Sequence, residues 1–222
     1  MSQRPLGGWG EFWLVVIGAF GIFAITSVFL ALHPAANLGH STYSFWQLIL
    51  YELVGAAVLG VLLHYRGWTL RSLGLTFHWT DVPIGLGLAA IVWLIYFTCW
   101  TGLTHYAPQL GLTVGQRPIL QSGLSLSSAV AVIIVNPLYE EVFVTGYIVT
   151  ALRGVRDTNF AVTVSTAVRL VYHLYQGVVG VALIIPLGLI FATWFAAKRR
   201  LWPLIVAHAV FDAIPIVWYA MR

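Results

Sequence analysis

The chain has 222 residues, of which 60% are hydrophobic and only 8% charged, and its net charge is +4. Soluble domains carry about 25% charged residues, so this composition excludes a soluble globular protein. At about 20 residues per span, the length allows about seven spans and no separate soluble domain. We therefore expect an all-α fold, a polytopic transmembrane helical bundle that forms one domain over residues 1–222. The positive charge is attributed to cytoplasmic loops, so no nucleic-acid partner is expected.

Seven apolar runs predict the spans in chain order. They cover residues 12–32, 44–64, 82–103, 124–152, 159–176, 178–197 and 201–219. Most basic residues follow the second, fourth and sixth runs: Arg66, Arg71, Arg153, Arg156, Lys198, Arg199 and Arg200. The opposite side holds only Arg4, Arg117 and Arg222. By the excess of Lys and Arg in cytoplasmic loops, we assign these three loops to the cytoplasm, with an external N-terminus and a cytoplasmic C-terminus.

The connections between the spans give three further expectations. Leu70, Leu73, Leu75 and Phe77 follow the second run and are expected along the membrane interface. Residues 104–123 are polar and rich in Gly and Pro, which predicts an external loop. The connection at residues 176–180 is very short, so it is open to interpretation as a bend within the membrane.

Two adjacent carboxylates, Glu140 and Glu141, lie in the middle of the fourth run, in a chain with only seven acidic residues. An ionised carboxylate at this depth costs roughly 2–4 kcal/mol, so it usually faces a protein-lined cavity and a partner. Neighbouring helix positions point about 100° apart, so the two carboxylates are expected to have different roles. Pro137 removes a backbone donor just before them and is expected to loosen the helix. The structural alternative is a pair of carboxylates bonded to neighbouring helices.

Polar side chains on two later spans reach a similar depth. The fifth run carries Arg169 and His173, and the seventh carries His208 and Asp212, each pair four residues apart on one helix face. Counted from the basic ends, Glu141 lies about 18 Å, His173 about 21 Å and His208 about 12 Å into the membrane. This agreement predicts one shared polar site, in a cavity between the fourth, fifth and seventh spans, within a core of residues 124–220.

Each of these residues also has a structural explanation. A histidine inside a membrane can be a hydrogen-bonded packing residue, and Arg169 can simply neutralise a glutamate. Asp212 lies near the external end of its span, where water can solvate it. Glu52, the acidic residue of the second span, is interpreted as a structural partner. The conjunction of all these residues at one depth favours a functional site.

The set suits the activation of water. A carboxylate held by a histidine can act as a general base toward a water molecule. A second histidine or another hydrogen-bond donor can stabilise the oxyanion formed on an attacked carbonyl. The same side chains could equally hold Zn²⁺ with an open position. The candidate metal ligands are Glu140, His173, His208 and Asp212.

In these motifs the sequence resembles the CPBP intramembrane proteases. The shared pattern is Glu140-Glu141 with Gly146, then Tyr172-His173 through Gly177, then His208-x-x-x-Asp212. The family groups type II CAAX prenyl endopeptidases with bacterial bacteriocin-processing and "Abi" proteins. The resemblance implies a helical membrane fold, a site reached from the cytosol and hydrolysis of a peptide bond near the membrane. It also implies Glu140 as the water-activating base with His173 as its partner, and His208 with Asp212 as oxyanion stabilisers or metal ligands.

The chain departs from the family pattern at three positions. Thr145 stands where the first motif usually has Arg, and Arg169 stands where Phe often precedes the motif histidine. We expect Arg169 to restore the charge partner of Glu141 from a neighbouring helix. Asp212 stands where Asn is common. A carboxylate donates a hydrogen bond only when protonated, so an ionised Asp212 suits metal ligation or orientation of His208.

The function expected is that of an intramembrane endopeptidase in a prokaryotic cytoplasmic membrane. Its partners would be the lipid bilayer and a peptide or membrane-associated protein substrate, and the sequence does not indicate an oligomeric state. The main alternative is a catalytically weakened or inactive relative that binds a peptide or membrane partner, which Thr145 favours. A proton-coupled transporter is a third reading, but it predicts repeat symmetry between the two halves, and only the second half has a polar cluster.

Overall fold

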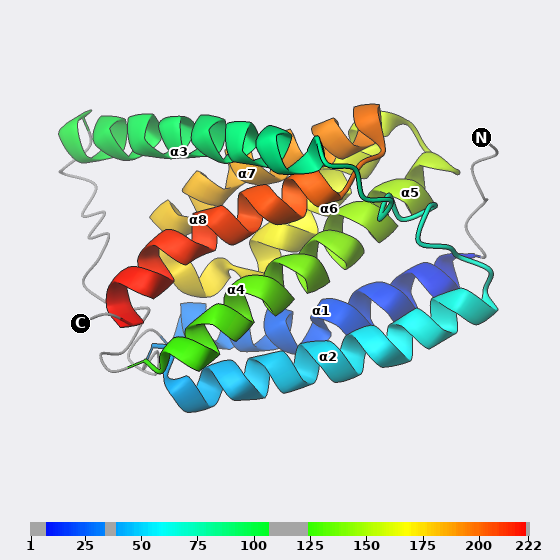
Figure 1. Cartoon of the computed structure of the whole chain (residues 1–222), viewed down its shortest axis with the longest axis horizontal. Coiled ribbons are helices and arrows are strands. Elements are labelled where there is room, and N and C mark those ends of the chain that lie inside the picture. Colours follow the sequence, from blue (N-terminus) through cyan, green and yellow to red (C-terminus); the bar gives the residue numbers. More distant parts are fainter. Residues whose placement is uncertain (1–7, 34–38, 107–123, 221–222) are drawn as a thin grey trace.

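The computed structural model describes residues 8–33, 39–106 and 124–220, and the long elements in these ranges are all helices, as the composition predicts (Figure 1). The predicted external loop at residues 104–123 falls mostly outside the described residues. The helices are α1 Trp9–Leu32, α2 Thr42–Tyr65, α3 Asp81–Tyr106, α4 Leu126–Glu140, η3 Glu141–Tyr147, α5 Ile148–Arg153, α6 Thr158–Tyr172, η4 Leu174–Gln176, α7 Gly177–Lys198 and α8 Trp202–Ala220.

Five of these helical stretches are long and apolar enough to cross a membrane. They are Trp9–Leu32, Thr42–Tyr65, Asp81–Leu103, Leu126–Arg153 and Val179–Lys198. The fourth stretch joins α4, η3 and α5 into one continuous rod of 28 residues. Helix α8 contributes a shorter apolar segment, and α6 has only 15 residues. The chain is an integral membrane helical protein, whereas crossing of the bilayer by α6 and α8 stays a prediction.

The fifth predicted span ends earlier than the sequence pattern suggested. Helix α6 stops at Tyr172, and His173 follows as its C-terminal cap with φ of −109°. One turn of 3-10 helix, η4, then leads to Gly177, which has φ of +77° and begins α7. A positive φ at this turn favours glycine, because it has no Cβ. His173 therefore lies at a helix end, next to the turn, and not inside a continuous span to Gln176.

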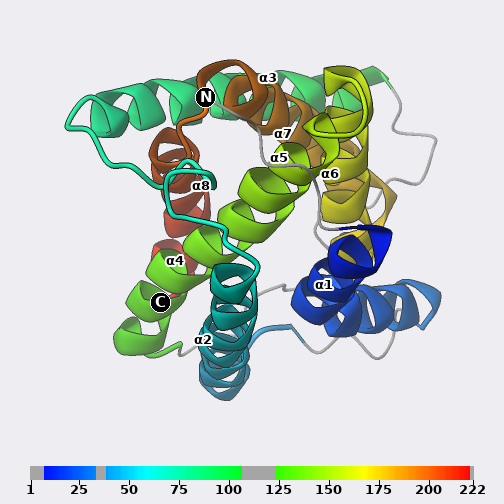
Figure 2. The ribbon, with the colours of Figure 1, turned by 90° about the vertical axis from the view of Figure 1, so that its right-hand side faces the viewer.

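The three basic loops meet at one end of the bundle. Arg153 donates a hydrogen bond to the carbonyl of Ala196 near the end of α7. Arg199 donates to the carbonyl of Ser72 (2.8 Å), and Arg200 pairs with Asp81 at the start of α3. We call this the basic end, defined by residues 66–72, 153–156 and 198–200. It is the right-hand side of Figure 1 and faces the viewer in Figure 2.

The start of α1 lies at this same basic end. Glu11 accepts hydrogen bonds from Arg66 Nε (2.8 Å) and Trp68 Nε1 (3.0 Å), which join the first turn of α1 to the end of α2. The chain cannot therefore have both cytoplasmic basic loops and an external start of its first helix. The predicted combination of cytoplasmic basic loops with an external N-terminus is wrong, because loops after even-numbered spans lie on the side where the first span begins.

The loop between α2 and α3 packs partly into the bundle. Trp68 and Leu73 are buried, and the carbonyl of Gly74 accepts a hydrogen bond from the backbone N–H of Leu201 (2.9 Å). The carbonyl of Leu75 accepts another from the Trp202 indole (3.0 Å). Leu70 stays exposed. The expectation that the whole loop lies along the membrane interface is therefore wrong for Leu73, because these hydrogen bonds hold its backbone against α8.

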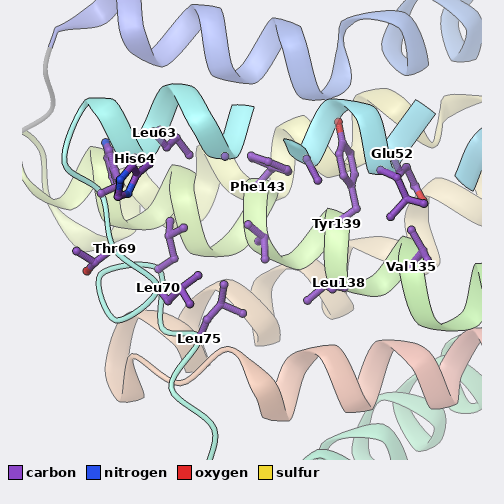
Figure 3. A pocket seen from close by; sticks show the side chains of 16 residues that line it. Glu52, Leu63, His64, Thr69, Leu70, Leu75, Val135, Leu138, Tyr139 and Phe143 are labelled. Atoms are coloured by element: carbon purple, nitrogen blue, oxygen red, sulfur yellow. The ribbon is translucent and has the colours of Figure 1, made fainter. Parts of the chain in front are cut away.

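An apolar pocket of about 520 Å³ lies between α2, α4, η3 and the loop that follows α2 (Figure 3). It follows α2 from Glu52 to His64, twelve residues or about 18 Å of helix. Tyr139 and Phe143 form part of the opposite wall. The pocket lies on the α2 side of α4. A cavity between the fourth, fifth and seventh predicted spans stays a prediction.

Candidate active site

The helix that carries the two glutamates changes its winding at Glu141. Helix α4 continues through Pro137 to Glu140, and then η3 is a π-helix from Glu141 to Tyr147. Proline lacks a backbone N–H and disturbs the α-helical ladder, and π-helical turns occur often at functional sites. The carbonyl of Val144, within η3, accepts a hydrogen bond from Ser165 of α6 (2.6 Å). The change in winding therefore both rotates the side chains and ties this segment to α6.

Close backbone packing at η3 depends on Gly146. A Cβ at this position would lie 3.1 Å from the carbonyl oxygen of Leu73 and 3.2 Å from Leu201 Cδ2. Both distances are tighter than ordinary van der Waals contact, so a larger residue would push the α2–α3 loop and the start of α8 away from η3. The glycine of the first motif thus allows η3 to pack closely against the α2–α3 loop and the start of α8.

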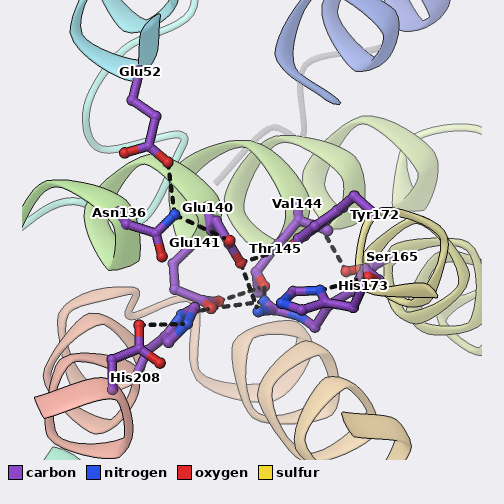
Figure 4. Close-up of polar contacts among 12 residues, drawn as sticks. Glu52, Asn136, Glu140, Glu141, Val144, Thr145, Ser165, Tyr172, His173 and His208 are labelled. Atoms are coloured by element: carbon purple, nitrogen blue, oxygen red, sulfur yellow. Dashed lines mark hydrogen bonds and ion pairs between the residues drawn. The ribbon is translucent and has the colours of Figure 1, made fainter. Parts of the chain in front are cut away.

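Glu141 is fully buried and fully bonded (Figure 4). Its Oε1 accepts hydrogen bonds from Arg169 Nη2 (2.7 Å) and His208 Nδ1 (2.8 Å). Its Oε2 accepts from Thr145 Oγ1 (2.7 Å). Three helical segments, η3, α6 and α8, are therefore held together by one carboxylate. A carboxylate so bonded is suited to orienting its neighbours.

Arg169 supplies the positive charge of the site from α6. Only 1% of this residue is exposed, and its guanidinium also reaches Glu140 Oε2 (3.5 Å) and Thr145 Oγ1 (3.3 Å). Its other face lies over the Phe191 ring, with Cζ 5.8 Å from the ring centroid. The expectation that Arg169 replaces the motif arginine as the partner of Glu141 is confirmed. The guanidinium occupies the space beside Thr145 that an arginine on η3 would need.

Glu140 faces a different set of donors. Its Oε2 accepts a short hydrogen bond from Tyr172 OH (2.6 Å), and its Oε1 accepts one from Asn136 Nδ2 (3.2 Å). Neither donor was predicted from the sequence. Asn136 lies four residues before Glu140 on the same helix face, a spacing that could have revealed it. Tyr172 directly precedes the motif histidine, but nothing in its spacing indicated a bond to another helix.

His173 lies beside this carboxylate, but its hydrogen bond goes elsewhere. Its Nδ1 lies 2.9 Å from the carbonyl oxygen of Arg169. A carbonyl only accepts, so Nδ1 must carry the hydrogen, and in the neutral ring the lone pair is on Nε2. Within the described part of the chain, no hydrogen bond joins His173 to Glu140. The direct Glu140–His173 pair implied by the resemblance is therefore absent, because the end of α6 turns the ring toward its own backbone.

His208 is held between two carboxylates. Its Nδ1 lies 2.8 Å from Glu141 Oε1, and its Nε2 lies 3.4 Å from Asp212 Oδ2. This arrangement suits a doubly protonated imidazole, which donates from both nitrogens. The predicted contact between His208 and Asp212 across one helical turn is present. Asp212 keeps 27% of its side chain exposed, so the cluster meets its surroundings at this edge and at the half-buried His173.

Glu52 joins the cluster from α2. It is completely buried, and its Oε1 accepts a hydrogen bond from Asn136 Nδ2 (2.6 Å). Since the same nitrogen contacts Glu140, one amide bridges the two carboxylates. The expectation that Glu52 is a structural partner did not name Asn136 or Glu140 as the residues to which it is linked.

The residues as arranged do not fit a metal ion. Among the described residues, no group of three or more His, Cys, Asp or Glu side chains is placed to hold one. The Arg169 guanidinium lies against both glutamates, and both nitrogens of His208 face carboxylates. A divalent cation would have to displace these contacts, so no step is assigned to one. The Zn²⁺ site at Glu140, His173, His208 and Asp212 stays a prediction.

The fold and the cluster define a helical membrane protein with buried glutamate, arginine and histidine side chains from three helical segments. The family model described as "Type II CAAX prenyl endopeptidase Rce1-like" matches residues 122–214, which contain all three motifs. This match over residues 122–214 supports the resemblance to the CPBP intramembrane proteases that the motifs predict. Comparisons with curated proteins and with solved structures give no match.

Proposed function

We propose that the chain is an intramembrane endopeptidase that hydrolyses a peptide bond of a peptide or membrane-associated protein. The observation that carries this proposal is the different exposure of the two adjacent glutamates. Each accepts three hydrogen bonds, but Glu141 is completely buried, whereas Glu140 is 8% exposed and lies near the half-buried His173 (Figure 4). One carboxylate is thus fixed as an orienting group, and its neighbour is placed where a water molecule can enter.

In this mechanism Glu140 accepts a proton from water, and the hydroxide attacks the peptide carbonyl carbon. The Nε2 lone pair of His173 accepts a hydrogen bond from the second O–H of the water and so aligns the water oxygen. His208 keeps its Nδ1 contact with Glu141, and its Nε2–H leaves the longer contact with Asp212 (3.4 Å) to donate to the oxyanion that develops on the carbonyl. When the C–N bond breaks, Glu140 returns its proton to the leaving amine. Tyr172 and Asn136 hold the two carboxylate oxygens during these transfers.

In our proposal the five long helical stretches and the shorter α6 and α8 all cross the bilayer, and the basic end faces the cytoplasm. The distribution of arginine supports this orientation, since the three basic loops and the start of α1 share one end. The opposite end, where α8 finishes, would then face outward. A tag fused after the last residue should be accessible only to reagents added outside the cell. Labelling by a cytosolic reagent would reverse the orientation.

A second candidate is a relative that binds a peptide without cutting it. It is favoured by Thr145, which departs from the motif arginine, although Arg169 fills the same space. The two candidates differ in one measurement. Purified full-length protein in nanodiscs is incubated with internally quenched apolar peptides, and cleavage products are identified by mass spectrometry.

We expect cleavage by the native protein, none by Glu140→Gln, and cleavage close to native by Glu11→Gln, a matched glutamate variant at the basic end. A chelator should change the rate by less than about twofold, because Arg169 and His208 already contact the carboxylates that a cation would need. No cleavage of any peptide, with binding retained, would favour the binding protein.

A further inference from the structure

The apolar pocket beside α2 contains one polar group without a partner. Glu52 forms part of its wall, and Glu52 Oε2 is buried with no hydrogen-bond partner in the part of the chain that the structure describes. Leaving a buried acceptor unpaired costs about 1–3 kcal/mol, so such a group calls for an explanation. The other oxygen of Glu52 is bonded to Asn136, and Oε2 has almost no accessible surface, so a ligand in the pocket meets Oε2 when the side chain turns toward it.

Asn136 connects this pocket to the candidate base. Its Nδ2 donates to Glu52 Oε1 (2.6 Å) and to Glu140 Oε1 (3.2 Å), so the three side chains form one chain of contacts (Figure 4). The pocket end at Glu52 is therefore one amide group away from Glu140. A group bound there would lie next to the bond that Glu140 hydrolyses.

We propose that Glu52 is a substrate-positioning residue: its Oε2 accepts a hydrogen bond from a backbone N–H of the bound peptide. An apolar side chain of the same peptide fills the pocket toward Phe143 and Leu63. Asn136 then fixes Glu140 relative to the peptide. The inference rests on the proposed function and adds to it the recognition of an apolar side chain with an adjacent amide donor.

Two observations favour a peptide over a lipid chain as the occupant. The pocket is apolar along α2 but ends in an unpaired acceptor, which an acyl chain cannot satisfy and an amide N–H can. The acceptor is also tied to the candidate base through Asn136. Lipid binding in the pocket would not require this link between Glu52 and Glu140.

The test compares two kinds of probe on the full-length protein in nanodiscs. One is the best-cleaved member of an internally quenched apolar peptide set, or the tightest-bound member if none is cleaved. The other probes are copies of that peptide, N-methylated at one amide at a time around the scissile bond. N-methylation removes the donor and keeps the side chains. For each peptide, kcat/KM is measured with the native protein. The binding affinity is measured with Glu140→Gln, which is expected not to cleave the peptide.

We expect N-methylation at one position to lower kcat/KM and affinity about tenfold, the effect of one hydrogen bond. In Glu52→Gln the amide oxygen can still accept from Asn136, but the amide nitrogen then replaces Oε2. A donor would face the pocket, so the penalty of N-methylation should fall below about twofold. A purely structural role for Glu52 would lower activity without changing this ratio.

Filling the pocket provides a second test. Gly60 lines it, and a Cβ built there meets no atom within 4 Å, so Gly60→Leu can be accommodated. Gly87 of α3 is the matched control, since it also has open space but lies outside the pocket wall. Gly60→Leu should raise KM about tenfold with little change in kcat, and Gly87→Leu should change neither.

The outcomes separate this inference from the proposed function. Cleavage with the same N-methyl penalty in native protein and Glu52→Gln would overturn the inference and keep the protease. Binding with the predicted loss of penalty, but no cleavage, would keep the inference and overturn the protease. If no probe binds, or if Gly60→Leu releases a copurified lipid and leaves peptide kinetics unchanged, Glu52 does not position a peptide.

Discussion

Helix α4 separates two regions, and each contains a buried carboxylate with a different number of hydrogen bonds. Glu141, between α4, α6 and α8, accepts three hydrogen bonds, one from a guanidinium. Glu52, between α2 and α4, accepts one hydrogen bond from an amide and keeps one oxygen unpaired. Both residues are completely buried. The comparison teaches that burial alone does not assign a role: the saturated carboxylate orients the site, and the unsaturated one is open to a ligand.

The two regions also differ in how deeply their helices are embedded in the protein. In the α4–η3–α5 rod 56% of the apolar window is buried, against 22% in α2. A charged pair in the rod has protein on all sides, where its interactions are strong and its desolvation is costly. This predicts that substitutions in the cluster affect folding far more than substitutions at Glu52.

The largest effect is expected from Arg169→Leu. It removes the cation that contacts both Glu140 and Glu141 and leaves only His208 beside Glu141, and breaking a buried pair from one side costs about 3–5 kcal/mol. Arg169→Lys should cost less, because the charge remains although the two-nitrogen contact is lost. Thermal unfolding in detergent measures both. Arg156→Leu, at the basic end, is the control. An unfolding temperature of Arg169→Leu equal to that of the control would remove Arg169 as the central cation.

Thr145→Arg should also be destabilising, by about 2–3 kcal/mol, because a second guanidinium would be buried in the space that Arg169 fills. This reverses the expectation from the motif alone, in which an arginine at this position restores the family pattern. The double variant Thr145→Arg with Arg169→Phe should recover most of the stability and activity. Equal losses in the single and double variants would show that the two positions do not share one cation site.

The smallest effect is expected from Glu52→Leu. It removes a carboxylate that has one hydrogen-bond partner, Asn136. The Asn136 amide keeps its contact with Glu140, so we expect a change in unfolding free energy of about 1 kcal/mol or less. Glu141→Leu, the matched substitution, should cost about 3–5 kcal/mol because Arg169 and His208 lose their shared partner. Similar losses for the two variants would erase the difference between the regions.

The sequence predicted the all-helical class and the meeting of Glu140, Glu141, Arg169, His208 and Asp212. Polar residues are so few in apolar runs that their depth alone brings them together. Tyr172 was not predicted, because its contact with Glu140 depends on how far each helix is rotated, whereas Asn136 was missed although it lies four residues before Glu140 on α4. The rotation is set by η3, and a π-helix leaves no simple periodic pattern in the sequence. The bend after Tyr172, which aims His173 at its own helix, has the same origin in local backbone geometry.

The sequence analysis paired cytoplasmic basic loops with an external N-terminus, a combination that the structure contradicts. Loop charges fix a side of the membrane only when each span's direction is followed back to the first helix. The Glu11–Arg66 contact supplies that direction, since it joins the start of α1 to the end of α2. No local pattern in the sequence pairs these two residues, which lie in different helices.

The most direct measurement is peptide cleavage and thermal unfolding side by side for Glu140→Gln and Glu141→Gln. The two residues are adjacent and the substitutions identical, so each variant is the control for the other. The account predicts that Glu140→Gln lowers kcat/KM at least a thousandfold with nearly native stability. Glu141→Gln should be clearly less stable, because Arg169 loses its closest anion. Cleavage retained by Glu140→Gln, or full stability retained by Glu141→Gln, would contradict the division of roles between the two glutamates.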